Sequence, residues 1–150
     1  MRHVATQGAG ELSGQYCFTI ETDPAELERL IDAVAEIGEK ENWSPDLVFR
    51  VHLALEELGL NIINYGYDEG VHEIECRVTS QPEEVTIEVW DDGRPFDPLH
   101  DAPEADVSST LEDRPVGGQG VHLVRTMMDQ FRYQRVSGRN HVTLVSRRVG

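Results

Sequence analysis

Three short segments of this 150-residue chain carry carboxylates, an amide and glycines at spacings that suit binding chemistry. In the first, Glu57 precedes Asn61 by four residues in a helical pattern, so the two side chains share one helix face. The second is Asp-Asp-Gly at residues 91–93, after a strand-like run, and the third is Gly-Gly-Gln-Gly at residues 117–120, before a helical pattern. Taken together and in this order, the three segments predict a nucleotide site.

The pair formed by Glu57 and Asn61 stands out because residues 53–63 are mostly apolar. A carboxylate on a buried helix is costly unless it has a partner or a function. In the functional interpretation, Asn61 supplies an amide oxygen to Mg²⁺, which takes few protein ligands. Glu57 then acts as a general base, or positions an attacking hydroxyl or water. The alternative is an amphipathic helix with a solvated acidic edge, since Glu56 is adjacent.

The strand before the second segment fixes where its two acids point. Successive side chains of a strand alternate between faces, so Asp91 shares the inner face with Val85, Ile87 and Val89. Asp92 then points outward. A carboxylate at the rim of the core suits hydrogen bonding to the exocyclic amine of adenine, and Gly93 lets the backbone approach the ring closely. The alternative is an ordinary Asp-Gly turn.

Glycines at Gly117, Gly118 and Gly120 precede the last helical pattern. Free backbone N–H groups and the positive end of a helix dipole are the usual means of binding phosphates. The alternative, a flexible hinge, is compatible with this role. Arg114, three residues before the glycines, is a candidate contact of the γ-phosphate, or else a surface arginine.

The composition limits the ligands and partners of this chain. A formal net charge of −15, from 28 acids and 13 bases, argues against nucleic acid and anionic membranes as partners. A bound anion must therefore be held locally by backbone amides, a divalent cation and a few arginines. Cys17 and Cys76 lie outside any CxxC spacing and are expected to be reduced thiols in a cytoplasmic protein. No apolar run approaches the roughly 18 residues of a transmembrane helix.

The periodicity of the sequence predicts the elements that position these residues. Capping signals at Asp23-Pro24 and Ser44-Pro45 begin two helices. The expected elements are a strand at 16–20, helices at 24–41 and 45–65, strands at 73–78 and 85–90, and a long loop at 94–115. Residues 117–120 then lead into a helix that continues through Val121, Val124 and Met128, and a hairpin of 131–136 with 141–146 closes the chain. This order predicts an α+β two-layer sandwich, a mostly antiparallel sheet covered on one face by helices. Residues 1–14 are expected to be a flexible N-terminal segment. One domain, 15–150, then follows, with a lid at about 94–118.

With these segments in this order, the chain resembles the GHKL (Bergerat-fold) ATP-binding superfamily. Residues 55–67 resemble its N-box, most closely that of the small bacterial anti-sigma-factor serine kinases. Residues 91–98 resemble the first glycine box, and residues 111–125 resemble the lid end and the second glycine box. Asn140 also fits the pattern. The resemblance spans roughly residues 16–148, and it implies the histidine-kinase-like ATPase fold.

The resemblance also implies roles for individual residues. By matching positions, Asn61 would hold Mg²⁺ and Glu57 would be the catalytic acid–base residue. Asp91 and Gly93 would recognise adenine. Gly118 and Gly120 would contact the phosphates. The chain departs from the family at Leu60, where threonine is frequent, and at Tyr65, where histidine or a similar residue is frequent.

The implied function is that of a cytoplasmic serine/threonine protein kinase that uses ATP and Mg²⁺. Such kinases phosphorylate a STAS-type antagonist in a bacterial partner-switching circuit, sequester a sigma factor and form homodimers. A length of 150 residues leaves no room for the further domains of histidine kinases or gyrase-like relatives. The alternative is an ATP-binding interaction protein without phosphotransfer, which Leu60 and an outward-facing Trp90 keep open.

Overall fold

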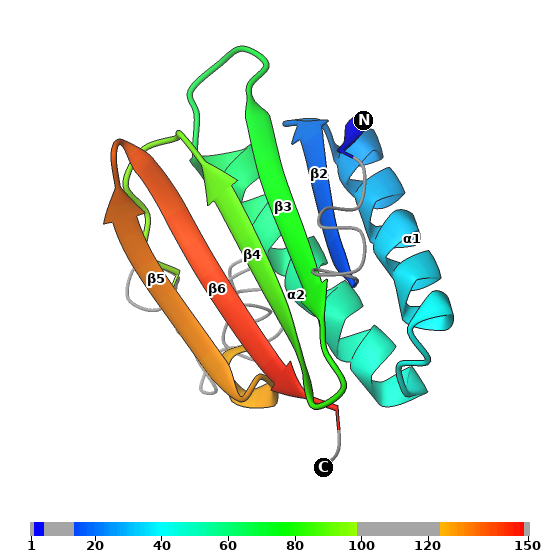
Figure 1. The fold of residues 1–150 in the computed structure, drawn as a ribbon. Coiled ribbons are helices and arrows are strands. Elements are labelled where there is room, and N and C mark those ends of the chain that lie inside the picture. Colours follow the sequence, from blue (N-terminus) through cyan, green and yellow to red (C-terminus); the bar gives the residue numbers. More distant parts are fainter. Residues whose placement is uncertain (1, 5–13, 99–123, 149–150) are drawn as a thin grey trace, which may run out of the picture.

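A sheet and two helices make up most of the described part of the protein (Figure 1). The computed structural model describes residues 2–4, as backbone only, together with residues 14–98 and 124–148. The strands are β1 (Arg2–Val4), β2 (Gln15–Glu21), β3 (Glu73–Ser80), β4 (Glu84–Asp91), β5 (Gln130–Val136) and β6 (Arg139–Arg147). The helices are α1 (Pro24–Lys40) and α2 (Pro45–Tyr65). The strand order is β1-β2-β3-β4-β6-β5, and every neighbouring pair is antiparallel.

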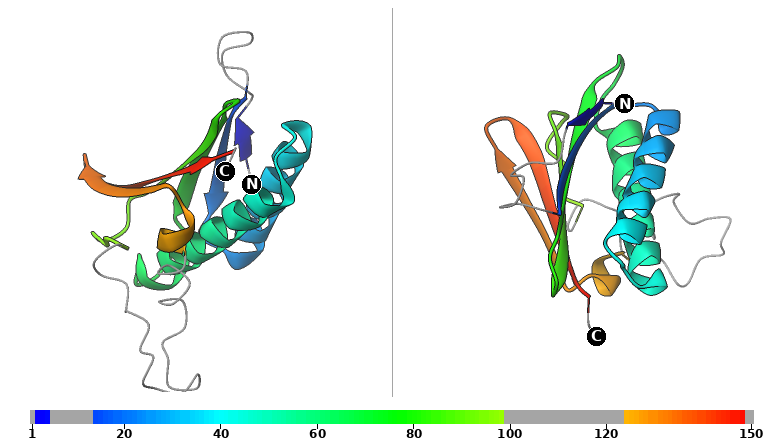
Figure 2. Two further views of the ribbon diagram at one scale, coloured as in Figure 1. Left: turned by 90° about the horizontal axis from the view of Figure 1, so that it is seen from below. Right: turned by 45° about the vertical axis from the view of Figure 1, so that its right-hand side comes forward.

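Both helices lie on one face of the sheet, which confirms the predicted α+β two-layer sandwich (Figure 2). Each helix begins where its capping signal predicts. The side chain of Asp23 accepts from the backbone N–H of Ala25, and Ser44 Oγ accepts from the N–H of Leu47, in each case at 3.2 Å. The proline that follows each cap needs no hydrogen bond for its nitrogen. Of the described helices, neither combines the length and apolarity that a membrane crossing requires.

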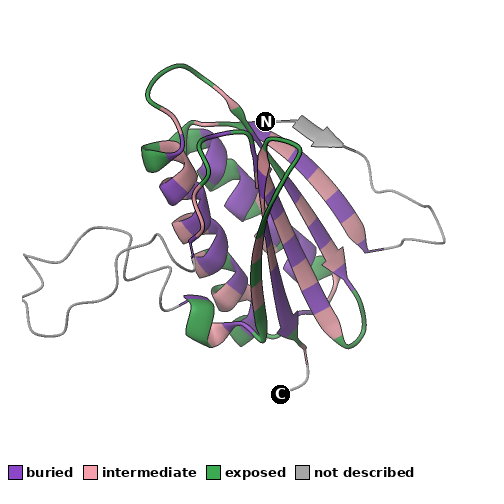
Figure 3. Ribbon diagram, turned by 90° about the vertical axis from the view of Figure 1, so that its left-hand side faces the viewer, coloured by how far each residue is buried: buried purple, intermediate pink, exposed green. Residues whose placement is uncertain are grey.

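Alternation along β4 determines which side chains reach the core. Val85, Ile87, Val89 and Asp91 are buried, while Asp92 is exposed, as predicted. Figure 3 shows buried and partly buried residues in alternation along the strands. From α2, the residues that complete this core are Leu47, Val51, Ala54, Leu55 and Leu58. Asp91 is the last residue of β4 and pairs with Asn140 of β6. The core therefore ends, at this edge, in a carboxylate beside an amide.

Three features go beyond the elements expected from sequence. Residues 2–4 pair with β2 as the short strand β1, within the segment expected to be flexible. The strands β3 and β6 are longer than predicted. Of the helix expected after residues 117–120, the described part is one helical turn at residues 124–127. The expected lid is described only as far as Pro98.

Gly59 allows the close packing of α1 against α2. A Cβ atom at this position would lie 2.5 Å from Cδ1 and 3.1 Å from Cγ of Leu27, which is 4% exposed. A buried leucine cannot move away freely, because protein interiors are close-packed. The glycine in the middle of α2 is therefore explained by helix packing.

We predict that Gly59→Val lowers the free energy of unfolding by about 1–3 kcal/mol, the usual range for overpacking a core. Urea denaturation measures this change. Asn64→Val is the matched control, since it places the same side chain at an exposed position of α2 and should change stability by less than about 0.5 kcal/mol. Equal effects of the two substitutions would contradict the assigned role of Gly59.

Candidate functional site

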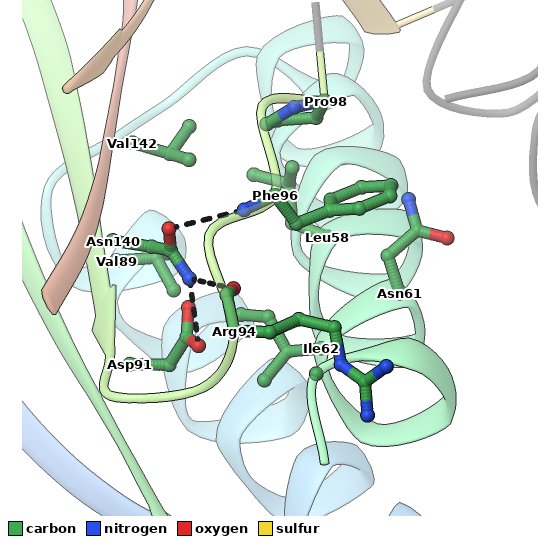
Figure 4. A pocket seen from close by; sticks show the side chains of 11 residues that line it. Leu58, Asn61, Ile62, Val89, Asp91, Arg94, Phe96, Pro98, Asn140 and Val142 are labelled. Atoms are coloured by element: carbon green, nitrogen blue, oxygen red, sulfur yellow. Dashed lines mark hydrogen bonds between the residues drawn. The ribbon is translucent and has the colours of Figure 1, made fainter. Parts of the chain in front are cut away.

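A pocket lies between α2, the end of β4, the segment that follows β4, and β6 (Figure 4). Its empty space is about 400 Å³, counted out to its open mouth. The lining residues are Leu58, Asn61, Ile62, Gly66, Val89, Asp91, Arg94, Phe96, Pro98, Asn140 and Val142. Most of these residues are apolar, and the few polar side chains among them come from different elements. Such a pocket suits a flat, largely apolar ring with a small number of hydrogen-bonding edges.

Asp91 is the acid of this pocket, and it is only 4% exposed. Burial raises its pKa above the ordinary value, because the ionised form loses hydration. Two hydrogen bonds offset part of this effect. Oδ2 accepts from the backbone N–H of Gly93 at 2.9 Å and from Nδ2 of Asn140 at 3.1 Å. Among the described residues none donates to Oδ1, so this oxygen is available to a ligand.

Asn140 holds Asp91 and the following segment together. Its Nδ2 donates to Oδ2 of Asp91 and, at 2.9 Å, to the carbonyl of Arg94. Its Oδ1 accepts from the N–H of Phe96 at 3.3 Å and from the hydroxyl of Tyr133 at 2.6 Å. The side chain is 4% exposed, so these four bonds satisfy a buried amide completely.

Sequence reasoning noted that Asn140 fits a family pattern but gave it no role. A signal was present. Asn140 has the same strand phase as Val142 and Leu144, both buried, so alternation places its amide in the core. A buried amide needs partners. The partners follow only from the pairing of β6 with β4 on one side and with β5 on the other.

The packing of the chain requires a glycine at position 93, independently of any ligand. A Cβ atom here would lie 2.6 Å from the carbonyl oxygen of Gly66 and 2.8 Å from Oδ2 of Asp91. The neighbouring N–H of Arg94 donates to that same carbonyl at 3.0 Å, which joins the end of α2 to the end of β4. The absence of a side chain thus permits two chain segments to meet. The predicted approach of Gly93 to an adenine ring stays a prediction.

Asn61 projects from α2 into the same pocket and is 7% exposed. Its Nδ2 is buried and has no hydrogen-bond partner among the described residues. Half a turn of the carboxamide exchanges its oxygen and nitrogen in the same space, so the group can present an oxygen to a cation. A single amide oxygen fits Mg²⁺, which keeps several waters and binds through few protein ligands.

Glu57 lies one turn before Asn61 on α2, beside the pocket and not among the residues that line it. Partial burial, and secondarily the charge of Glu56, raises the pKa of Glu57. Glu56 has a partner on its own helix, with 3.6 Å between its Oε2 and Nε2 of His52. No described residue forms an ion pair with Glu57. The two adjacent acids therefore occupy different environments.

The positions at which the chain departs from the family pattern also have defined surroundings. Leu60 packs partly buried against the core and does not line the pocket. Tyr65 is 48% exposed, and its ring stacks on Phe96, with centroids 6.5 Å apart. Tyr65 thus supports a residue of the pocket wall.

Several predicted phosphate contacts lie outside the described residues. These are Arg114, Gly117, Gly118 and Gly120. Among the predicted site residues that are described, Asn61 and Asp91 meet in one pocket. The backbone N–H of Gly93 donates to the carboxylate of Asp91, and Glu57 lies beside the pocket without lining it.

Comparison with known proteins identifies the family. Residues 20–146 match the family described as histidine kinase-like ATPase domain. The chain belongs to this family. The match covers most of the chain, and it confirms the GHKL-type resemblance that the N-box and the first glycine box indicated.

Two curated relatives carry kinase names. Serine/threonine-protein kinase BtrW of Bordetella bronchiseptica is 32% identical over 112 residues, which cover 73% of this chain and 78% of the relative. Serine-protein kinase RsbW of Bacillus cereus is 26% identical over 108 residues, which cover 70% and 68%.

A solved structure shares the fold of this family member. A crystal structure of the RsbU and RsbW domains of a Mycobacterium tuberculosis protein superimposes with a TM-score of 0.60 at 13% identity. The superposition covers 89% of this chain and 32% of that chain. At this level of identity, the likeness concerns the fold alone.

We predict that Asp91→Asn stabilises the free protein at neutral pH. Because burial raises the pKa of Asp91 in the folded state, ionisation of this group opposes folding above the ordinary carboxyl pKa of about 4. The variant removes this penalty, so its urea midpoint at pH 7 should exceed that of wild type. The difference should vanish below about pH 4, where the wild-type carboxyl is protonated in both folded and unfolded states.

Asp92→Asn removes the same charge from an exposed neighbour and serves as the control for net charge. Its urea midpoint should show no comparable rise. A lower midpoint for Asp91→Asn at neutral pH would show that the two hydrogen bonds to Oδ2 outweigh the effect of burial, which would contradict the assignment.

Proposed function

We propose that this protein is a serine protein kinase that uses Mg-ATP and phosphorylates a STAS-type antagonist domain in a bacterial partner-switching circuit. Family membership and the kinase names of its relatives support ATP binding and phosphotransfer. One observation carries the proposal for this chain. Asn61, whose Nδ2 has no hydrogen-bond partner among the described residues, and Asp91 line the same apolar pocket.

In this proposal the adenine ring occupies the pocket, between apolar side chains of α2 and of the strands. Oδ1 of Asp91 accepts a hydrogen bond from the exocyclic amine. Arg94, at the pocket wall, is half exposed and forms an ion pair with Asp68. The phosphates then extend toward Asn61 and the predicted glycine segment at residues 117–120, with Arg114 as a further phosphate contact.

Asn61 would hold Mg²⁺ through its amide oxygen, and the ion, when bound, would supply positive charge to the phosphate oxygens. Glu57 accepts the proton of the serine hydroxyl at its carboxylate. The serine oxygen forms a bond to the γ-phosphorus while the bond to the β–γ bridging oxygen breaks, so ADP leaves and phosphoserine remains. Because its pKa is raised, the Glu57 carboxylate is a stronger base than an exposed glutamate.

A second candidate function is that of an ATP-binding protein that sequesters a sigma factor without phosphotransfer. Two observations favour it. Leu60 replaces the frequent threonine of the N-box, and Trp90 lies on the face of the sheet opposite the helices. The Trp90 ring stacks on His141 with centroids 4.5 Å apart, and the guanidinium of Arg77 lies 4.9 Å from its centroid. Homodimer formation and a cytoplasmic location belong to both proposals.

We predict that Glu57→Gln reduces serine phosphorylation of a candidate antagonist domain by at least about a hundredfold, the lower range for loss of a general base. Phosphoserine formation with Mg-ATP measures the rate, and calorimetry should show ATP affinity within about threefold of wild type, since Glu57 does not line the pocket.

The matched control is Glu56→Gln, which removes the adjacent carboxylate and its contact with His52. This variant should keep its activity. Retained phosphorylation in Glu57→Gln would refute the kinase mechanism. Tight ATP binding by wild type without phosphoserine would favour the sequestering protein.

We predict that Asn61→Ala abolishes the part of ATP affinity that depends on Mg²⁺. Calorimetry with Mg²⁺ and with excess EDTA separates the two contributions, and the EDTA value should be unchanged. The thermal midpoint of the free protein should not fall substantially, because the substitution removes a buried amide group that lacks a partner. Asn64→Ala, at an exposed position of α2, is the control. Undiminished Mg-dependent affinity in Asn61→Ala would overturn the assignment.

A further inference from the structure

The two oxygens of the Asp91 carboxylate differ in their hydrogen bonds, because both donors bond to the same oxygen. Oδ2 receives the N–H of Gly93 at 2.9 Å and Nδ2 of Asn140 at 3.1 Å (Figure 4). Among the described residues, no group donates to Oδ1. Rotation of the carboxylate would break both bonds, so its orientation at the pocket wall, and with it the position of Oδ1, is fixed.

We infer that Asn140 is a positioning residue for purine selection: by occupying Oδ2 of Asp91, it leaves Oδ1 as a fixed acceptor that admits a 6-amino purine and rejects a 6-oxo purine. This inference rests on the proposed ATP site and concerns how that site discriminates between nucleotides. An oxygen in place of the amino group would face a carboxylate oxygen with no proton between them. Buried polar groups left unpaired in this way give strong discrimination.

The donor of Asn140 also favours the charged form of the acid. A hydrogen bond to a carboxylate favours ionisation, and burial opposes it. For Asp91 burial is the larger influence, so its pKa is raised even with both donors in place. Loss of one donor would leave the carboxylate less firmly ionised. Asn140 therefore serves both the orientation and the charge of Asp91.

The other charged or titratable groups near Asp91 do not replace this donor. Arg135 of β5 lowers the pKa of Asp91 through its charge, but its Nη1 donates to the carbonyl of Gly93 at 2.7 Å. Asp92, the next residue, raises that pKa. The hydroxyl of Tyr67 donates to Asp92 at 2.6 Å, while that of Tyr133, on β5, donates to Asn140. Among the described side chains, Asn140 alone donates to Asp91.

A purely structural role is the competing explanation. Asn140 also donates to the carbonyl of Arg94 and accepts from the N–H of Phe96, so its loss would loosen the segment after β4. Weaker nucleotide binding alone would not separate the two roles. The ratio of the dissociation constants for a 6-oxo and a 6-amino purine nucleotide does separate them, because a loosened segment alone weakens the binding of both nucleotides alike.

The decisive variant is Asn140→Asp, which keeps the shape of the side chain and replaces the donor by a second carboxylate. Calorimetry would measure ATP affinity, with Mg²⁺ present, from about pH 5 to about pH 8.5. Wild-type affinity should fall toward acid pH, because protonation of Asp91 removes the acceptor. The variant should bind ATP at least about tenfold more weakly at pH 8 and should gain affinity toward acid pH, because a proton shared by the two carboxylates restores a donor to Oδ2.

Tyr133→Phe is the matched control. It removes one hydrogen bond from Oδ1 of Asn140 and leaves both donors of Asp91 in place. This control should keep the wild-type direction of pH dependence, with affinity within about threefold. If the Asn140 variants weaken the binding of ATP and GTP by the same factor, the role of Asn140 is structural and the inference is wrong.

A second variant covers the case in which Asn140→Asp does not fold, as judged by circular dichroism. Asn140→Ala leaves Gly93 as the remaining donor and frees the carboxylate to turn. The ratio of GTP to ATP dissociation constants should fall at least about tenfold relative to wild type. An unchanged ratio would overturn the inference. A failure of the kinase proposal can be told apart from a failure of this inference. In that case Glu57→Gln would still phosphorylate the antagonist domain, while the Asn140 variants would still change nucleotide selection.

Discussion

A buried, ionisable carboxylate at the end of a central strand is the constraint on which this site depends. Asp91 lies in an apolar pocket, and desolvation raises its pKa. The acid is tolerated because Gly93 and Asn140 both donate to Oδ2. Those donors exist because β6 pairs with β4 at this point and because a glycine turns the chain directly after the strand. The position and hydrogen bonding of this carboxylate are thus a consequence of strand register.

The helical half of the site reaches Asp91 through backbone contacts. The carbonyl of Gly66, at the end of α2, accepts from the N–H of Arg94, and the absence of a side chain at Gly93 permits this approach. Asn61 of the same helix lines the pocket, and within the described part of the chain its Nδ2 has no hydrogen-bond partner, while Glu57 lies beside the pocket. The two halves carry separate tasks in the proposed kinase: the strands select the base, and the helix serves the phosphates and the acceptor hydroxyl.

Local patterns predicted much of this arrangement. Capping residues located both helix starts, and strand alternation placed Asp91 inside and Asp92 outside, because these properties depend on neighbouring residues in sequence. Two features could not be obtained in this way. The partners of Asn140 depend on which strands pair, and the requirement for Gly93 arises from the carbonyl of Gly66, which is distant in sequence. Sequence reasoning placed Glu57 and Asn61 on one helix face, and the structure distinguishes one that lines the pocket from one that does not.

The most direct test of the central claim compares ATP with inosine triphosphate, which carries an oxygen in place of the 6-amino group. Calorimetry on the wild-type protein with Mg²⁺ would give both dissociation constants. If an available oxygen of Asp91 selects the base, ATP should bind at least about a hundredfold more tightly, as expected when a buried acceptor loses its donor. Equal affinities would show that the strand-end carboxylate does not read the purine, and the account of this pocket would be wrong.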